Sequence, residues 1–206
     1  MSSNQKIFEK FYREADGPEG LPWHRDHPPH FLDAAIQAKA PPARALDVGC
    51  GTGTYSVHLA QCGYKVTGID FVEDALKLAR NRAKEAGVTI EFENCDVLSF
   101  RPNEPYDLVI DSGCLHSLDD KTRPAYLDNL LSWLRPGGQF VLVHFNKRHA
   151  IDWRPFGPRR WKRARVEAFL ADSFTCKDYH EEILHPPFPI GPTALCSTYW
   201  LERVQP

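Results

Sequence analysis

The sequence predicts an α/β fold, a Rossmann-like doubly wound sheet of about seven mostly parallel strands. Short apolar runs alternate with helical patterns along most of the chain, and this alternation is typical of parallel sheets that carry helices on both faces. The first apolar run leads directly into a loop with glycine at every second position, Gly49, Gly51 and Gly53. Such a loop between a strand and a helix indicates a nucleotide-binding turn.

Each further element follows from a local pattern. The N-terminal segment begins with apolar side chains at helical spacing. The helix expected at 73–86 ends before Gly87, and glycine commonly stops helices. The other helices are expected at 31–39, 54–62, 122–134 and 163–171. The strands after the first are expected at 65–69, 88–92, 106–111, 139–145, 174–182 and 194–204.

The spacing of the glycines and a nearby acid indicate which ligand the turn suits. A dinucleotide fingerprint requires a third glycine three residues after the second, before a helix N-terminus that receives a pyrophosphate. The candidate positions hold Thr54 and Ser56, so this fingerprint fails. The carboxylate of Asp47, inside the strand end, would repel a pyrophosphate but suits a ligand that carries an ammonium and a sulfonium.

This region resembles the first motif of the class I S-adenosylmethionine (SAM) dependent methyltransferases, which reads here Leu46-Asp47-Val48-Gly49-Cys50-Gly51-Thr52-Gly53. Asp70 at the end of the second strand and the turn at 134–138 also match the family. The resemblance covers roughly residues 43–204. It implies SAM as the cofactor, S-adenosylhomocysteine as the product and an antiparallel C-terminal hairpin. The single domain then consists of a SAM-binding part, 43–206, and an N-terminal helical cap segment, 1–42.

The resemblance assigns the cofactor contacts to the ends of successive strands. Asp70 would accept hydrogen bonds from both ribose hydroxyls. Asp96 would approach the adenine amino group and Val97 would pack against the ring, while Asp111 and Ser112 would line the methionine end. The full set of cofactor-binding residues in this part of the chain is Asp47, Gly49, Cys50, Gly51, Thr52, Gly53, Asp70, Phe71, Asp96, Val97, Asp111 and Ser112.

The N-terminal segment carries a second resemblance. The dipeptide Pro22-Trp23 resembles the thiopurine, tellurite and thiol/halide methyltransferase group, in which a tryptophan covers SAM. By this resemblance Trp23 packs on the methionine or sulfonium end of SAM, where the face of an aromatic ring attracts a cation, and Tyr12 donates its hydroxyl. The other interpretation of the aromatic stripe at 7–12 is a helix packed on the domain.

His116 is the candidate catalytic residue. Methyl transfer needs alignment of the nucleophile, the methyl carbon and the sulfur, and a base only for a hydroxyl or an amine that arrives protonated. Because an imidazole titrates near neutrality, His116 is interpreted as a general base or a substrate contact. The alternative is a helix-start or core histidine that hydrogen-bonds a carbonyl. The segment 111–118 lacks the Asn-Pro-Pro-Tyr type of motif, which weighs against adenine and glutamine amino groups as acceptors.

The long connection 146–162 leaves the carboxyl end of the sheet, where ligands bind in open α/β folds. We therefore predict substrate contacts from Asn146, Trp153, Arg154 and Phe156. The predicted acceptor is a small molecule, preferably a thiol or a related soft nucleophile, and the arginines also allow an anionic aromatic acceptor. Two alternatives remain open. One is an RNA or protein methyltransferase that uses the basic loop 147–165, and the other is a non-catalytic SAM-binding module.

Composition limits the remaining classes. With 25 basic and 27 acidic residues the formal net charge is -2, so binding of nucleic acid or membranes is not expected. No apolar run reaches membrane-spanning length, and we expect a soluble cytoplasmic monomer or homodimer. Six scattered cysteines suggest neither a zinc site nor a disulfide framework. Pro28 and Pro29 interrupt any helix that would align His24, His27 and His30, so no metal is expected.

Overall fold

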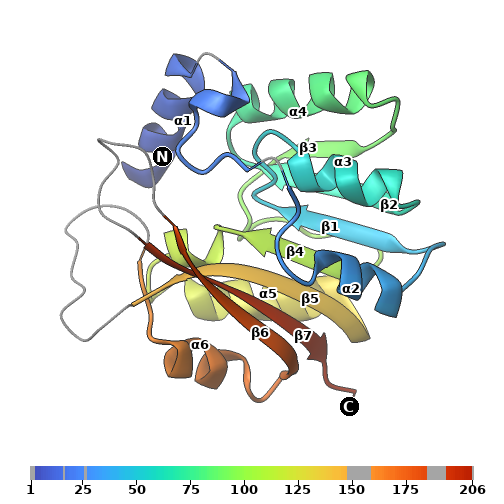
Figure 1. Cartoon of the computed structure of the whole chain (residues 1–206), viewed down its shortest axis with the longest axis vertical. Coiled ribbons are helices and arrows are strands. Elements are labelled where there is room, and N and C mark those ends of the chain that lie inside the picture. Colours follow the sequence, from blue (N-terminus) through green and yellow to red (C-terminus); the bar gives the residue numbers. More distant parts are fainter. Residues whose placement is uncertain (1–2, 16, 26, 148–158, 185–193, 206) are drawn as a thin grey trace.

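The computed structural model describes residues 3–15, 17–25, 27–147, 159–184 and 194–205, which surround one mixed β-sheet (Figure 1). Its strands are β1 (Arg44–Val48), β2 (Lys65–Asp70), β3 (Glu91–Asn94), β4 (Tyr106–Ser112), β5 (Leu134–Asn146), β6 (Phe174–Leu184) and β7 (Ala194–Arg203). They lie in the order β3-β2-β1-β4-β5-β7-β6. Strands β1 to β5 pair in parallel, and β7 is antiparallel to β5 and β6. The predicted sheet with an antiparallel C-terminal hairpin is confirmed.

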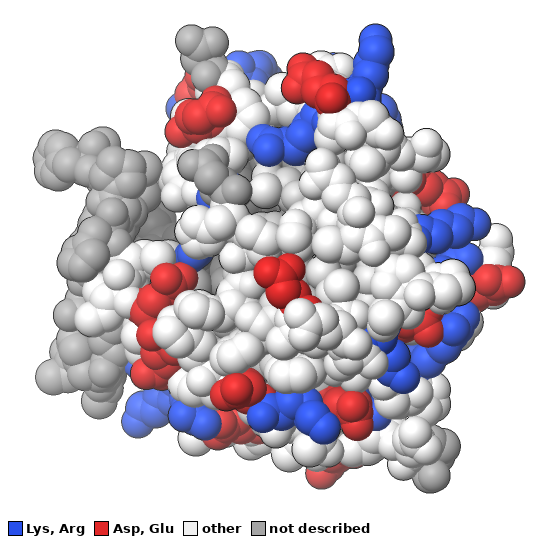
Figure 2. All heavy atoms as spheres, turned by 45° about the vertical axis from the view of Figure 1, so that its right-hand side comes forward, with Lys and Arg blue, Asp and Glu red and all other residues white. Residues whose placement is uncertain are grey.

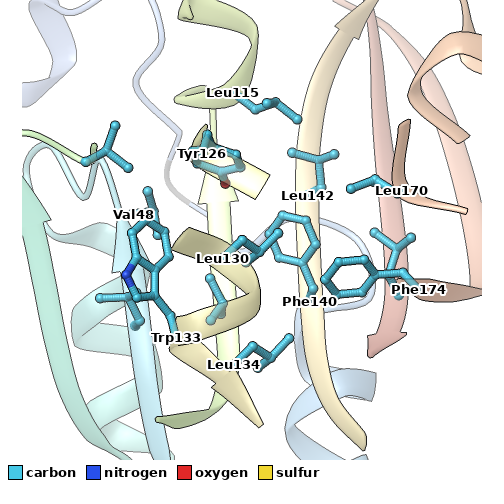
Figure 3. Packing of buried hydrophobic residues seen from close by; sticks show 14 of the residues in the cluster. Val48, Leu115, Tyr126, Leu130, Trp133, Leu134, Phe140, Leu142, Leu170 and Phe174 are labelled. Atoms are coloured by element: carbon cyan, nitrogen blue, oxygen red, sulfur yellow. The ribbon is translucent and has the colours of Figure 1, made fainter. Parts of the chain in front are cut away.

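Helices cover both faces of this sheet. They are α1 (Ser3–Glu14), α2 (Leu32–Ala38), α3 (Thr54–Gln61), α4 (Glu73–Glu85), α5 (Arg123–Trp133) and α6 (Arg163–Leu170), with the short 3₁₀ turns η1 (Pro18–Gly20) and η2 (Leu115–Ser117). Helices α5 and α6 pack on one face, where Tyr126 and Trp133 of α5 join a core cluster with Phe140 of β5 (Figure 3). Leu32 of α2 and Leu59 of α3 belong to the cluster on the opposite face.

The direction of winding reverses between β1 and β4, which lie side by side in the middle of the sheet (Figure 1). After β1 the chain proceeds outward to β2 and β3 and then crosses back to β4. The register pairs Val48 with Ile69 of β2 and with Asp111 of β4, so the carboxyl ends of three strands meet at one edge. In open α/β sheets ligands bind at such a switch point.

Two strands begin where the local pattern did not place them. β3 starts at Glu91, three residues after the predicted start, because the end of α4 uses the intervening chain: the N–H groups of Gly87 and Val88 return to carbonyls of the last helical turn. β5 starts at Leu134, five residues before the predicted start. Leu134 already pairs with Tyr106 of β4, and the next pair is Gln139 with Leu108. The register shift between these two pairs accommodates the residues of the predicted turn, so β5 runs through them.

Helix α1 of the N-terminal segment lies beside α4, whereas α2 lies next to β5 (Figure 1). Tyr12 of α1 and Leu21 pack against Val72 and Ala75, at the start of α4. These contacts hold the segment on the sheet, and its predicted boundary at residue 42 stays a prediction. In the part of the chain that the structure describes, every helix is too short or too polar to cross a bilayer. Lys and Arg side chains are interspersed with Asp and Glu on the face in Figure 2.

Candidate active site

The glycine turn after β1 requires glycine for two physical reasons. All three of its glycines have positive φ angles, 66° at Gly49, 53° at Gly51 and 74° at Gly53, which other residues adopt only with strain. The turn is also crowded. A Cβ at Gly53 would lie 2.9 Å from the Cβ of Ala79 in α4, and a Cβ at Gly51 would lie 2.7 Å from the hydroxyl oxygen of Tyr12. The turn is therefore held between α4 and α1.

Two carboxylates shape the turn from β1 and β2. Asp47, at 1% exposure, accepts a hydrogen bond from the Ser56 hydroxyl (2.6 Å). Asp70 accepts the backbone N–H groups of Gly51 (2.9 Å) and Val72 (2.8 Å) through different oxygens. Burial raises the pKa of Asp47 to about 7 and that of Asp70 to about 6, although these hydrogen bonds act in the opposite direction. This edge of the sheet therefore carries negative charge when the two carboxylates are ionised, and the amount of charge depends on pH.

A third carboxylate, Asp111 at the end of β4, is fully buried. Its Oδ1 accepts the N–H groups of Gly113 (3.0 Å) and Cys114 (2.7 Å), and its Oδ2 accepts the N–H of Leu115 (3.0 Å) and the hydroxyl of Tyr126 (2.5 Å). Burial raises its pKa to about 6. Four donors occupy the lone pairs of this carboxylate, so its evident task is to hold the loop that leads to η2. Its contact with the cofactor stays a prediction.

An aromatic cluster from the N-terminal segment lies beside the turn. The indole N–H of Trp23 donates to the hydroxyl of Tyr12 (3.3 Å), and the Trp23 ring contacts Phe8 and Phe11 edge-on, each at 5.3 Å. Tyr12 is buried, whereas Trp23 is 37% exposed. The structure therefore brings Tyr12 to Gly51 and places Trp23 next to it.

The predicted adenine-side residues follow β2 and β3. Asp96 is exposed, and its carboxylate accepts the N–H of Leu98 (2.8 Å). Val97 is buried, and Phe71 is half-buried with its ring 6.0 Å from that of Phe8. Phe71 thus lies beside α1, whereas Val97 belongs to the core cluster that also contains Leu115 and Tyr126.

Three further predicted cofactor residues are Cys50 and Thr52, within the glycine turn, and Ser112, at the end of β4. Cys50 and Thr52 are buried, and burial raises the pKa of the Cys50 thiol well above its ordinary value. A Cβ at Gly68 in β2 would lie 3.1 Å from the Cys50 sulfur, so the thiol fills space between β1 and β2. Ser112, at the end of β4, shares a hydrogen bond with Tyr55 of α3.

His116 lies in η2 and is 7% exposed. Its Nδ1 accepts the backbone N–H of Phe145 (3.4 Å), because β5 continues beyond the end of β4 and leaves this N–H without a strand partner on that side. Burial, with contributions from His144, Arg123 and Arg160, holds the pKa of His116 well below its ordinary value. The imidazole is therefore neutral at physiological pH, and it accepts a backbone N–H where the alternative prediction had it bonded to a carbonyl.

Asn146 ends β5 in a buried polar network. Its side-chain NH₂ donates to the hydroxyls of Tyr199 (2.8 Å) and Tyr179 (3.3 Å), and its Oδ1 accepts the Nδ1–H of His144 (3.1 Å). At 1% exposure this amide is occupied by protein partners, so its predicted substrate contact is not favoured by the geometry and stays a prediction. The other predicted substrate residues, Trp153, Arg154 and Phe156, lie outside the described residues.

The described end of the long connection is attached to η2 and β5. The N–H of Arg159 donates to the carbonyl of His116 (2.8 Å), and Lys147 donates its N–H to the carbonyl of Trp161 (2.9 Å). The guanidinium of Arg123 lies 4.0 Å above the Trp161 ring. The connection therefore returns next to the candidate catalytic histidine.

Two structural residues of the site were not singled out by sequence reasoning. Arg25 links the N-terminal segment to the C-terminal hairpin through Glu182 (2.8 Å) and the sulfur of Cys196 (3.3 Å). A charged residue two positions after Trp23 could have suggested a role for it. Tyr126 binds Asp111 from the middle of an ordinary helical pattern, and no local signal marks it.

Other features of the described residues lie away from this edge. A cavity of about 350 Å³ opens beside α3 and the end of α4, with Thr54, His58 and Arg82 in its wall, and none of the predicted cofactor residues lines it. Among the described residues, no three His, Cys, Asp or Glu side chains come together in a way that could hold a metal ion. All six cysteines are free thiols.

Comparisons with known proteins identify the family. Residues 45–138 match a family model described as a methyltransferase domain. The chain is 31% identical over 155 residues to the 2-heptyl-1-hydroxyquinolin-4(1H)-one methyltransferase of Mycobacteroides abscessus, a match that covers 71% of this chain and 67% of that protein. It is 32% identical over 139 residues to the ubiquinone biosynthesis O-methyltransferase of Xanthomonas euvesicatoria, covering 66% of this chain and 57% of that enzyme.

A solved structure shows the same fold. The N-methyltransferase NodS from Bradyrhizobium japonicum, in complex with S-adenosylhomocysteine, superposes with a TM-score of 0.74 at 21% identity, over 99% of this chain and 100% of that one. Together with the sequence matches, this likeness shows that the chain belongs to the class I SAM-dependent methyltransferases. The closer resemblance to the thiopurine, tellurite and thiol/halide group stays a prediction.

The residues present fit SAM as the cofactor of this family. Crowding at Gly51 and Gly53 keeps the turn bare of side chains, so that backbone can approach a ligand closely. Asp47 and Asp70 supply negative potential at the same edge, which suits a cationic cofactor. Asp70, whose carboxylate is held by backbone N–H groups of the turn and of the residues after β2, would hold the ribose, and the Tyr12 and Trp23 pair would cover the turn.

Proposed function

We propose that this protein transfers a methyl group from SAM to a small-molecule acceptor. The observation that carries the proposal is the placement of the His116 loop against the glycine turn. A Cβ at Gly49 would touch the Cβ of Cys114 at 3.4 Å, so the residues after β4 and the predicted cofactor turn form one continuous surface. When bound there, SAM supplies a methyl group on a positively charged sulfur. An acceptor held beside η2 would then face the methionine end of the cofactor.

The residues of the chain position the reactants and exclude water. Asp70 and Gly51 hold the turn in shape, Asp47 contributes negative potential, and the aromatic rings of Tyr12 and Trp23 shield the site from solvent. Alignment of this kind lowers the barrier of a displacement reaction by several kcal/mol. Covalent participation of the protein is not required.

For the acceptor we propose a small aromatic compound with an acidic hydroxyl or thiol. The thiol was predicted from the Pro22-Trp23 resemblance. An oxygen acceptor is supported by the names of two relatives, one a methyltransferase of a hydroxyquinolinone and one an O-methyltransferase of ubiquinone biosynthesis. The sequence match spans only 57% of the second relative, so its substrate is a guide to chemical class alone.

The polymer-methylating alternative receives less support from the described residues. Arg163 pairs with Glu167 (2.6 Å), and Arg165 pairs with Asp120 (3.3 Å). Basic side chains that are already neutralised contribute little to phosphate binding. Salt-sensitive binding of RNA by the wild-type protein would reverse this preference.

The test compares two arginine substitutions in a SAM-consumption assay with hydroxylated aromatics and aromatic thiols as acceptors. In Gly51→Arg the new side chain must pass the Tyr12 hydroxyl, and cofactor binding and turnover should be lost. Gly87→Arg is the matched control, since Gly87 also has a positive φ (68°) but open space around it. Full activity of Gly51→Arg would contradict the proposed site. Calorimetric SAM binding without turnover of any acceptor would instead favour the non-catalytic module.

A further inference from the structure

The hydrogen bonds of His116 define which of its nitrogens carries the proton. Because the backbone N–H of Phe145 donates to Nδ1, that nitrogen must present a lone pair. A neutral imidazole has one protonated nitrogen, so the proton is on Nε2. His116 therefore offers the Nε2–H as a hydrogen-bond donor. A general base would instead need a lone pair on Nε2.

The donor edge of His116 faces the backbone of the loop that follows β4. Its Nε2 lies 3.3 Å from the position that a Cβ on Gly113 would occupy, and Gly113 is the second residue beyond Asp111 at the end of β4. The next residue, Cys114, packs against Gly49 of the glycine turn. Glycine at 113 thus leaves the space in which the Nε2–H approaches the backbone of the loop after β4.

The neighbouring groups do not replace His116 as a base. All four acceptor positions of Asp111 are occupied by donors of its own loop and α5. His144 is 0% exposed, its Nδ1–H is bonded to Asn146, its Nε2 has no hydrogen-bond partner among the described residues, and burial lowers its pKa to about 4. An imidazole with so low a pKa accepts a proton poorly from a hydroxyl or a thiol.

The charges around the His116 ring favour an anion. Arg123 and Arg160 both act on the His116 ring as positive charges. Arg123 is 1% exposed, and its Nη2 has no hydrogen-bond partner among the described residues. Its Nη1 is paired with Asp120 (2.6 Å), so Nη2 is the donor that stays available to nearby negative charge.

We propose that His116 is a hydrogen-bond donor to the acceptor, and that the acceptor is methylated as an oxyanion or a thiolate that has lost its proton to solvent before the reaction. The inference rests on the methyl transfer proposed above. The lone pair of the anionic oxygen or sulfur forms the bond to the methyl carbon, the carbon–sulfur bond of SAM breaks, and its electron pair stays on sulfur as neutral S-adenosylhomocysteine. The Nε2–H of His116 stabilises the acceptor anion and orients its lone pair, and no proton passes to the protein.

The first experiment measures kcat/KM against pH for a series of substituted phenols and thiophenols of graded acidity. The pH at which kcat/KM rises should move with the acceptor, following its own ionisation. A rise that stays at one pH for every acceptor and disappears in His116→Leu would report His116 acting as a base and would overturn the inference.

The second experiment separates a donor from a base by substitution. His116→Gln retains an N–H near the position of Nε2 and should lose less than about 5-fold in kcat/KM. His116→Leu removes the donor and should lose about 10- to 150-fold, the size of a hydrogen bond to a charged group. S-adenosylhomocysteine affinity, measured calorimetrically, should be the same in both variants. Equal losses in Gln and Leu variants that still bind S-adenosylhomocysteine would contradict a donor role.

A third measurement does not depend on turnover. 4-Nitrophenol absorbs differently as phenol and as phenolate, so its ionisation can be followed while it binds to the protein with S-adenosylhomocysteine. In the wild type the bound form should be the phenolate at a pH below its free pKa, and His116→Leu should abolish this effect. Binding as the neutral phenol, or no dependence on His116, would overturn the inference. If no acceptor is methylated, the proposed function fails, and this titration still decides how the site treats anions.

Discussion

Replacing Asp47 by asparagine removes a buried negative charge and keeps an oxygen to accept the Ser56 hydroxyl. Asp47 lies at the end of β1 at 1% exposure, and burial raises its pKa to about 7 from an ordinary value of 3.8. Asp70 and Asp111 add to this rise by like-charge repulsion. Asparagine cannot ionise, so the difference in the free energy of unfolding between the variant and the wild type reports the cost of burying this charge.

The sign of the effect follows from where the proton binds. Between pH 4 and pH 7 the folded protein keeps the Asp47 proton while the unfolded chain releases it, so the stability that this group contributes is complete below pH 4 and is lost as pH rises through about 7. Each pH step in this range corresponds to about 1.4 kcal/mol. From pH 5 to pH 8 the free energy of unfolding of Asp47→Asn should therefore rise by about 2 to 3 kcal/mol relative to wild type.

Urea unfolding of the ligand-free proteins at pH 5, 6, 7 and 8, followed by tryptophan fluorescence, measures this difference. A hydrogen-bond mismatch of the new amide would lower the stability of the variant by a similar amount at every pH and leave the trend unchanged. Asp128→Asn serves as the control, because Asp128 is exposed on α5 and its replacement should shift stability by less than about 0.5 kcal/mol. A constant difference between Asp47→Asn and wild type over this range would refute the reasoning.

Three further outcomes are expected. Gly53→Ala should destabilise the protein by at least about 2 kcal/mol more than Gly87→Ala in urea unfolding, because both positions have positive φ but only a Cβ at position 53 meets α4. Equal effects of the two substitutions would contradict the crowding at Gly53. Tyr126→Phe should cost about 1 to 3 kcal/mol, since Asp111 loses a buried donor, and a neutral result in thermal unfolding would count against that bond. Arg25→Gln should cost no more than about 1 kcal/mol but speed proteolysis of the N-terminal segment, and unchanged cleavage would show that the link does not anchor it.

Local sequence predicted the elements of this fold well because their signals act over a few residues. Gly87 ends α4 where the pattern placed the end, since a left-handed residue there returns its N–H to the helix. The start of β3 was wrong by three residues for the same reason: the capping turn uses the chain that the apolar pattern assigned to the strand. The antiparallel C-terminal hairpin came from the family resemblance, and the order of the strands was not predicted, because crossovers are not encoded in any one segment.

The glycine turn was predictable from the sequence, whereas the surroundings of His116 were not. The motif from Asp47 to Gly53 is contiguous, and the structure keeps it as one turn between α1 and α4. The chemical state of His116 depends on Phe145, 29 residues later in β5. The loop after β4 depends on Tyr126, 15 residues beyond the acid to which it donates. Neither partner has a sequence pattern that identifies its role.

By itself the sequence determined the class of fold, the glycine turn and the kind of cofactor, because spacing and residue type within short segments limit backbone conformation and charge. Only the tertiary structure decided that the carboxylate of Asp111 is occupied by its own loop and by α5, and that Nδ1 of His116 accepts a backbone N–H from β5. The physical reason is that hydrogen bonds between strands and helices distant in the chain determine which lone pairs stay available. Those lone pairs, more than the identity of the side chains, define what the site can do to an acceptor.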